Sequence, residues 1–370
     1  MAVRVVADVD LGALQRNVAR MAGVAAGAQV CAVVKADGYG HGALPAARAA
    51  LAGGASWLAV ATAQEALALR EGGVDGRVLV LGALSDAELP VALAAQADVV
   101  AWREPFVDRV RELGGGSVHV KLDSGMGRLG TRDVHEATRV AELAARSGGV
   151  TLAGLMSHFA TADDITDDFM GQQLSLFSAW AEPLRQRFPA ALMHVANSAA
   201  TLRDPATHFD MVRTGIAIYG MDPFGEDPAL RGFEPVLELR SYVAAVKQVA
   251  PGESAGYGRR FVASAATTIA TVPVGYGDGW RRALSGAADA LVGGRRVPVA
   301  GTISMDNLTL DLGLGGAAQV GDEVVLIGSR GEQRILAEEI ARRLGTINYE
   351  VTCGISARVP RVYHRDGVPA

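Results

Sequence analysis

The segment VVKADGYGHG, residues 33–42, places a lysine at the end of an apolar run and follows it with three glycines and Tyr39. β-Branched apolar runs favour strands, and glycine clusters end them. Lys35 is therefore predicted to lie where a strand ends. In a parallel α/β barrel, the reactive side chains lie at the carboxyl ends of the strands, which makes this lysine a candidate for chemistry.

Seven more runs of the same kind alternate with stretches of helical period, such as AQEALALREGG (63–73) and VHEATRVAELAARSGG (134–149). Eight strand–helix units in succession predict an α/β fold with an N-terminal (β/α)8 TIM-type barrel rather than an open doubly wound sheet. The expected strands cover residues 30–34, 57–61, 78–81, 99–102, 118–122, 152–156, 192–195 and 211–219.

The pattern changes after Pro235. Strand-like pieces, such as TTIATVPVGYG (267–277) and EVVLIG (323–328), are joined by glycine-rich turns, and a single helical pattern, RILAEEIARRLG (334–345), interrupts them. We expect a cofactor-binding barrel over residues 1–234 and a β-rich C-terminal domain over 235–370, with the first few residues able to pair with the second domain.

Composition narrows the functional classes. The 370 residues carry a net charge of -5, which gives no reason to expect nucleic acid or an anionic membrane as a partner. The two cysteines, Cys31 and Cys353, form no disulfide framework and lack the spacing of a metal site. No signal peptide or membrane span is apparent, so a cytoplasmic location is expected.

Lys35 has two interpretations. It could be an ordinary surface lysine at a strand end, or a half-buried amine with a lowered pKa that forms a Schiff base. The seventh and eighth runs lead into HVANSAA and RTGIAIYG, which offer the Ser198 hydroxyl and the amides of Gly215 and Ile216. Phosphate sites in such barrels commonly follow strands seven and eight. A lysine amine with a phosphate site indicates pyridoxal 5'-phosphate.

The chain also resembles the bacterial alanine racemases along almost its whole length. The segments that carry the resemblance, in order, are AVVKADGYGHG, VHVKLDSGMGRLG, GLMSHFATAD, HVANSAA, VRTGIAIYG, GYGRRF, PVGYGDGWRR, GTISMDN and INYEVTCGIS. This resemblance implies a pyridoxal-phosphate enzyme that interconverts L- and D-alanine and supplies D-alanine for peptidoglycan.

The resemblance implies a two-base mechanism in a homodimer with shared active sites. Lys35 would hold the cofactor and act as one base, and Tyr257 of the partner subunit would act on the opposite face. Arg213 would meet the pyridine nitrogen. Guanidinium only donates hydrogen bonds, so that nitrogen would stay unprotonated and the cofactor would be a weaker electron sink.

In SVHVKLDSG, apolar residues alternate with His119, Lys121 and Asp123. If the polar set points into the barrel, Lys121 is a buried cation that needs a neutralising partner. Family members often carbamylate this lysine, and the carbamate could brace Arg128 near the substrate carboxylate. The alternative is an unmodified Lys121 paired with Asp123 or another carboxylate.

The remaining assignments rest on the resemblance alone. His158 would pack against the cofactor ring, Tyr39 and Tyr349 would bind the phosphate, and the barrel floor would use His194 and Asn197. The substrate side would use Met305, Asp306 and Tyr276. Two positions depart from the family pattern, because Gly256 stands where many members have serine and Thr214 where many have proline.

Two rival classes share parts of this plan. Pyridoxal-phosphate decarboxylases have the same barrel and β-domain but usually set a carboxylate against the pyridine nitrogen, where this chain offers Arg213. A pyridoxal-phosphate homeostasis protein has a barrel without a second domain. The β-rich region with Tyr257 argues against that class.

Overall fold

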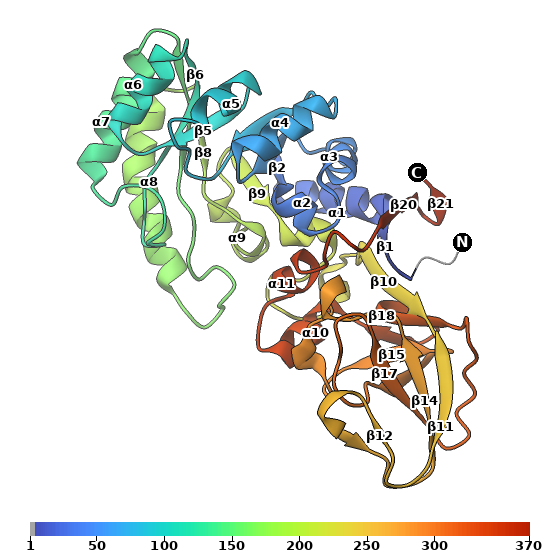
Figure 1. The fold of residues 1–370 in the computed structure, drawn as a ribbon. Coiled ribbons are helices and arrows are strands. Elements are labelled where there is room, and N and C mark those ends of the chain that lie inside the picture. The colour runs from blue at the N-terminus through green and yellow to red at the C-terminus, as the bar shows by residue number, and fades with distance from the viewer. Residues whose placement is uncertain (1–3) are drawn as a thin grey trace. The chain divides into compact units, whose positions relative to one another are not determined.

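The computed structural model describes residues 4–370, which divide into two compact units. The first, the barrel unit, consists of Leu14–Gly38 and Ala43–Ile218. The second, the β-rich unit, consists of the residues up to Ala13, Tyr39–Gly42 and Tyr219–Ala370. The ribbon in Figure 1 runs from blue at the N-terminus to red at the C-terminus.

The barrel unit is built on one eight-stranded sheet with the strand order β8-β7-β6-β5-β4-β3-β2-β9. All its strand pairs are parallel. Backbone bonds from Asp210 N to Met193 O and from Arg213 N to Ala196 O link the two ends of this order. The strands are β2 (Gln29–Val33), β3 (Trp57–Val60), β4 (Arg77–Val80), β5 (Asp98–Ala101), β6 (Gly116–Lys121), β7 (Val150–Met156), β8 (Leu192–His194) and β9 (Met211–Thr214).

The predicted (β/α)8 barrel is thus confirmed, but its eighth strand was expected to be too long. β9 ends at Thr214, and Ile216–Tyr219 forms a 3-10 helix, η2. The amides of Gly215 and Ala217 bond to the Ser198 hydroxyl oxygen instead of continuing a ladder. An apolar run alone cannot distinguish this change of conformation from a longer strand.

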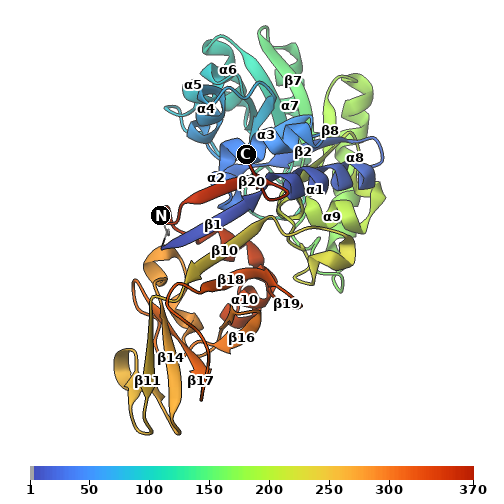
Figure 2. The same cartoon turned by 90° about the vertical axis from the view of Figure 1, so that its right-hand side faces the viewer.

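Helices cover the outside of the barrel strands in Figures 1 and 2. Their inward faces are rich in alanine, which allows close packing on the sheet; in α3, four alanines are buried. No helix within residues 4–370 is long and apolar enough to cross a membrane. The helices up to the end of the barrel are α1 (Leu11–Val24), α2 (Lys35–Tyr39), α3 (Ala43–Ala52), α4 (Ala63–Glu71), α5 (Leu89–Ala94), α6 (Glu104–Glu112), α7 (Val134–Arg146), α8 (Phe169–Arg187), α9 (Ser198–Arg203) and η1 (Pro205–Thr207).

The β-rich unit confirms the predicted change from alternating strands and helices to mainly strands. Its main sheet has the order β16-β15-β18-β10-β1-β20-β21, with β19 paired to β18, and smaller sheets are β11-β14-β17 and β12-β13. In Figure 2, β1 lies between β10 and β20, so the N-terminal strand belongs to the sheet of the C-terminal residues. The strands are β1 (Val5–Asp10), β10 (Leu237–Tyr242), β11 (Ala245–Val249), β12 (Ser254–Ala255), β13 (Phe261–Val262), β14 (Thr267–Val272), β15 (Asp289–Val292), β16 (Arg295–Pro298), β17 (Leu308–Gly313), β18 (Glu323–Arg330), β19 (Gln333–Ile335), β20 (Arg361–Arg365) and β21 (Val368–Pro369).

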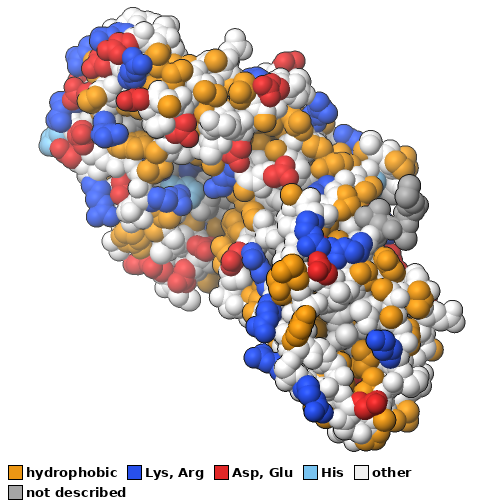
Figure 3. All heavy atoms as spheres, in the orientation of Figure 1, with side chains coloured by type: hydrophobic (Ala, Val, Ile, Leu, Met, Phe, Trp, Pro, Cys, Tyr) orange, Lys and Arg blue, Asp and Glu red, His pale blue; other side chains and the backbone are white. Residues whose placement is uncertain are grey.

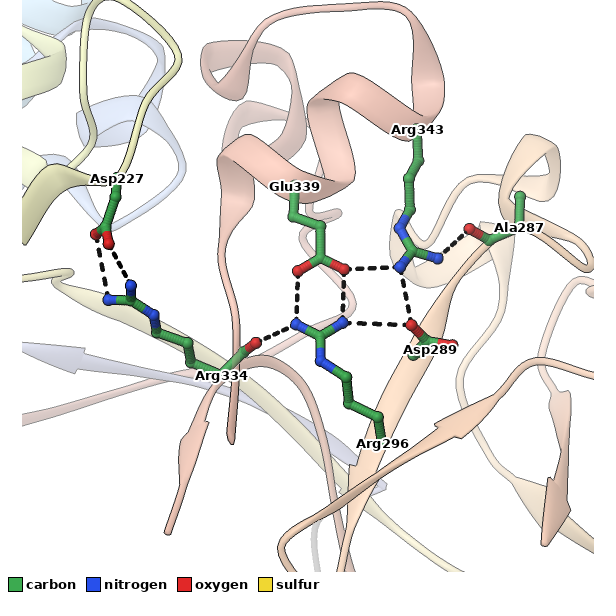
Figure 4. A network of polar contacts seen from close by, with 7 residues as sticks. All are labelled: Asp227, Ala287, Asp289, Arg296, Arg334, Glu339 and Arg343. Carbon is green, nitrogen blue, oxygen red and sulfur yellow. Dashed lines mark hydrogen bonds and ion pairs between the residues drawn. The ribbon is translucent and has the colours of Figure 1, made fainter. Parts of the chain in front are cut away.

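Ion pairs tie the predicted helix α10 (Ala337–Leu344) to the sheet of this unit (Figure 4). Arg296 makes two parallel bonds of 2.7 Å to the Glu339 carboxylate, and Arg343 bridges Glu339 and Asp289 at 2.8 Å each. This geometry holds both arginines with little freedom. The other helices of the unit are α11 (Asn348–Cys353), η3 (Pro228–Arg231), η4 (Tyr257–Arg259), η5 (Tyr276–Asp278) and η6 (Arg282–Leu284).

Candidate functional site

Lys35 lies two residues after the end of β2 and is half-buried, which agrees with the second of the two interpretations of this lysine. The backbone after it turns through a left-handed helical conformation, with φ of 53° at Ala36, 52° at Asp37, 61° at Gly38 and 55° at Tyr39. A residue other than glycine in this region costs roughly 1–2 kcal/mol. Strain of this kind persists only where surrounding contacts enforce it, and it is concentrated at functional sites.

Two carboxylates enforce the turn. Glu65 Oε1 accepts a hydrogen bond from the amide of Ala36 at 2.7 Å, and Asp37 Oδ1 accepts one from Ala43 N at 2.8 Å. Glu65 Oε2 also accepts bonds from the amides of Ala61 and Thr62, so one side chain joins the loops after β2 and β3. Sequence reasoning missed Glu65, although Thr-x-x-Glu before a helix is a recognisable capping box.

Arg213 lies on β9 and is only 3% exposed, so it is not a surface ion-pair residue. Nη1 bonds to His194 Nδ1 at 2.7 Å. Nη2 bonds to Ser157 O at 2.8 Å, to Val195 O at 3.1 Å and to His158 Nδ1 at 3.1 Å. Burial lowers the pKa of Arg213 to about 10, which leaves it protonated at neutral pH.

The two histidines beside Arg213 are neutral acceptors. Burial first, and then the nearby Arg213 charge, hold the pKa of both His158 and His194 well below the usual value. A neutral imidazole has one bare nitrogen, and the guanidinium requires that nitrogen to be Nδ1 in each ring. The structure therefore brings His158, His194 and Arg213 into one cluster.

The polar residues of β6 and the segment after it are buried, as expected for side chains that line the barrel; Lys121 is 4% exposed. Burial and the charges of Arg213 and Arg128 lower the pKa of Lys121 to about 8. Asp123 pairs with Arg132 at 3.1 Å and accepts bonds from the amides of Gly125 and Gly127. Within residues 4–370, Lys121 has no carboxylate at ion-pair distance, so the expected alternative of a Lys121–Asp123 pair is not formed.

The predicted phosphate-binding groups also lie together. Asn197, which the resemblance assigned to the barrel floor, lies beside them and caps α9 by accepting a bond from Ala200 N at 2.9 Å. Ser198 Oγ, 3% exposed, accepts the Gly215 amide at 3.0 Å. Ile216 follows at the start of η2. These residues follow the seventh and eighth strands of the barrel.

The other predicted residues belong to the β-rich unit. The ring centroid of buried Tyr39 lies 5.8 Å from that of Tyr349. Burial raises the pKa of Tyr39, and the nearby Tyr349 raises it further. Tyr276 N and Gly277 N donate to Ser304 O and Met305 O, so PVGYGDGW and GTISMDN are held side by side.

The side chains of Tyr257 and of the residues assigned to the substrate side are exposed. Tyr257 is 74% exposed, Met305 52% and Tyr276 41%, and Asp306 pairs with Arg358 at 2.7 Å. Gly256 has φ of 74°, a conformation that glycine adopts without strain. Figure 3 shows apolar and basic side chains intermingled on the visible face of the β-rich unit. The Tyr257 side chain therefore does not pack in the core of its own chain.

A parallel barrel with a lysine on a strained turn and a buried arginine between two neutral histidines is typical of an enzyme of the TIM-barrel class. Residues 9–223 match the alanine racemase N-terminal domain, and residues 236–363 match the alanine racemase C-terminal domain. The chain belongs to the alanine racemase family, whose members are isomerases that interconvert L- and D-alanine.

Relatives and solved structures agree along the full length. The alanine racemase of Geobacillus kaustophilus is 41% identical over 366 residues, covering 97% of this chain and 94% of that protein. That of Beutenbergia cavernae is 42% identical, covering 96% and 97%. The crystal structure of alanine racemase from D-cycloserine-producing Streptomyces lavendulae superposes with a TM-score of 0.93 at 38% identity and covers 98% of both chains.

Proposed function

We propose that the protein racemises alanine with pyridoxal 5'-phosphate and that its D-alanine supplies peptidoglycan synthesis in the cytoplasm. The observation that carries the proposal is the buried Arg213, flanked by the neutral acceptors His158 and His194. A donor-only guanidinium favours an unprotonated ring nitrogen. The cofactor then withdraws electrons weakly, which suits proton return at the α-carbon.

The residues present fit this cofactor. Lys35 offers a half-buried amine at a strand end. The phosphate would be held by Ser198, Gly215 and Ile216, with Tyr39 and Tyr349 also assigned to it. Nη1 and Nη2 of Arg213 are engaged with protein acceptors, and within residues 4–370 the Nε–H has no partner and remains for the ring nitrogen.

Pyridoxal 5'-phosphate, when bound, supplies an electron sink that acidifies the α-proton of the amino acid. Lys35 removes or returns that proton on one face, and Tyr257 of the partner subunit acts on the other. The high exposure of Tyr257 within its own chain supports this assignment to a second copy. Met305, Asp306 and Tyr276 complete the substrate side in the proposed homodimer.

Lys121 is proposed to carry a carbamate that orients Arg128 toward the substrate carboxylate. Its pKa of about 8 leaves part of the amine neutral and able to react with carbon dioxide. The charges that lower this pKa come from Arg213, Arg128 and Lys35, so an anion at Lys121 would relieve the repulsion among them. The modification is tested by mass spectrometry, which should show the mass of one added carbon dioxide on the peptide that contains Lys121.

The reaction is tested by incubating the purified protein with L-alanine in deuterium oxide. Chiral chromatography should show a shift toward equal amounts of both enantiomers, and proton NMR should show loss of the α-proton signal. Release of carbon dioxide and ethylamine would instead identify a decarboxylase. Bound cofactor with unchanged L-alanine would favour a carrier of the cofactor, a class that the β-rich unit argues against.

A further inference from the structure

A chain of four buried side chains crosses the barrel interior from β5 to β9. Asp98 Oδ2 lies 3.1 Å from His119 Nε2, His119 Nδ1 lies 2.8 Å from His194 Nε2, and His194 Nδ1 lies 2.7 Å from Arg213 Nη1. The two histidines are wholly buried, and Asp98 and Arg213 are 6% and 3% exposed. Every ring nitrogen of the chain therefore has a partner within the barrel unit.

The direction of these hydrogen bonds follows from the arginine. Because Arg213 can only donate, His194 Nδ1 must accept, and the proton of this neutral ring must be on Nε2. His119 Nδ1 then accepts from His194, which places the His119 proton on Nε2. That proton points at Asp98, a carboxylate that only accepts when ionised. One set of tautomers satisfies all four groups.

The opposite arrangement of ring protons is unfavourable at the Arg213 end of the chain. If His119 carried its proton on Nδ1, His194 would have to carry its own on Nδ1, facing the guanidinium donor at 2.7 Å. Two donors at this distance repel, and buried polar networks are costly when partly satisfied. The carboxylate of Asp98 is thus connected to the guanidinium of Arg213 through the hydrogen bonds of His119 and His194, although the two charged groups are not in contact.

The surroundings hold the His119 ring in place for this role. A Cβ atom on Gly154 would lie 2.2 Å from His119 Nδ1, so the absence of a side chain at this position leaves room for the ring. The Trp57 ring meets His119 edge-on at 5.6 Å. On the far side of Asp98, Arg77 donates to the same Oδ2 at 2.9 Å and stacks on Trp57 at 3.7 Å.

We propose that Asp98 is a positioning residue for Arg213. It accepts the Nε2–H of His119 and so holds the two rings in place, and His194 Nδ1 in turn holds Nη1 and sets the plane of the guanidinium. This inference rests on the proposed function where it concerns the cofactor ring, because the guanidinium plane decides where the remaining N–H points. The fixed tautomers do not depend on the cofactor.

The first test is nitrogen-15 NMR of histidine-labelled full-length protein without added cofactor. The wild-type protein should show a protonated Nε2 and a bare Nδ1 for both rings, with signals assigned from His119→Gln and His194→Gln variants. Asp98→Ala should keep both rings in the Nε2–H tautomer, which Arg213 imposes, but should move the His119 Nε2–H proton signal upfield, because this proton loses its carboxylate acceptor. Arg77→Met removes the other partner of Asp98 and should leave both rings unchanged.

The second readout is the affinity for pyridoxal 5'-phosphate, followed by absorbance. Asp98→Ala should weaken binding by at least about fivefold, the usual scale for a buried donor left without its acceptor, and lower kcat more than it raises KM. Gly154→Ala should weaken binding similarly with Asp98 intact, and Arg77→Met should stay within about twofold of wild type.

A wild-type spectrum with Nδ1–H on either ring overturns the proposal, and this measurement stands even if Asp98→Ala does not fold. An unchanged His119 Nε2–H signal in a folded Asp98→Ala protein, or a changed signal with unchanged cofactor affinity, overturns it as well. Failure of the proposed function would appear differently, as a wild-type protein that does not racemise alanine while its histidines keep the expected tautomers.

Discussion

The Glu65 carboxylate accepts a hydrogen bond of 2.7 Å from the backbone amide of Ala36, the residue that directly follows Lys35. Through its other oxygen, the same carboxylate holds the start of α4. Lys35 thus precedes a left-handed turn whose geometry depends on a neighbouring loop. This relationship suggests how the amine is kept in one position.

Glu65→Gln should disturb this turn. A glutamine amide has only one acceptor oxygen, so either the Ala36 amide or the amides of Ala61 and Thr62 would face a donor. We expect a loss of about 1–3 kcal/mol in the free energy of unfolding and slower covalent capture of pyridoxal 5'-phosphate by Lys35, measured by stopped-flow absorbance.

Thr62→Ala is the matched control for Glu65→Gln. It breaks the capping bond from Glu65 N to Thr62 Oγ1 at 3.1 Å but leaves the bond to Ala36 intact. It should cost about 1 kcal/mol of stability and leave the capture rate unchanged. If both variants slow the capture of the cofactor equally, Glu65 acts only as a helix cap.

The purified protein should be yellow, with the cofactor joined covalently to Lys35. Borohydride reduction followed by peptide mapping should place the label on Lys35, and Lys35→Ala should lack it. Lys121 is the internal control, because its lowered pKa also makes it a reactive amine. A label on Lys121 or on another lysine would contradict the assignment.

Activity should require two subunits, since Lys35 and Tyr257 are proposed to serve one site from different chains. Lys35→Ala and Tyr257→Phe homodimers should each be inactive. After subunit exchange, a hybrid dimer contains one site free of both changes, so part of the activity should return. Exchange is confirmed by native mass spectrometry, and exchange without recovered activity would point to sites built within single chains.

Arg213→Glu should change the reaction more than the fold of the site. A carboxylate near the ring nitrogen raises the pKa of that nitrogen and makes the cofactor a stronger electron sink. We expect slower racemisation, more transamination to the pyridoxamine form and a new visible absorption. A shift of about one to three pKa units corresponds to about 1.4–4 kcal/mol.

Arg213→Lys provides the comparison for Arg213→Glu, because it keeps the positive charge while losing the planar donors. It should slow racemisation without promoting transamination. A folded, cofactor-loaded Arg213→Glu protein with the wild-type rate and spectrum would show that Arg213 does not face the ring nitrogen.

The β-rich unit should lose stability in acid through Glu339. The hydrogen bonds from Arg296 lower the pKa of this carboxyl below its usual 4.5. A depressed folded-state pKa contributes stability that is present above 4.5 and is lost as the pH falls through the lower folded value. Arg296→Ala should cost about 1 kcal/mol near pH 7 and markedly less at pH 3, by denaturant unfolding at both pH values. A pH-independent difference would mean that the loss comes from packing.

Much of the barrel can be predicted from the sequence. Short β-branched runs such as 78–81 and 99–102 favour buried strands when helical stretches separate them, and Lys35 follows another such run directly. The ordered segments from AVVKADGYGHG to INYEVTCGIS also indicate the family. Local pattern was insufficient at Ile216–Tyr219, where side-chain bonds to Ser198 Oγ begin a 3-10 helix after an apolar strand.

The contacts that organise the site are decided by tertiary structure. Asp98, His119 and His194 are separated by 21 and 75 residues and meet only because parallel strands bring their side chains into one barrel. Glu65 reaches Ala36 across 29 residues because β2 and β3 are neighbours. The sequence by itself determined which residues are apolar, where strands end and which lysine follows one. Hydrogen-bond direction, burial and pKa depend on distances of a few ångströms between segments remote in the chain, and only the closed barrel sets those distances.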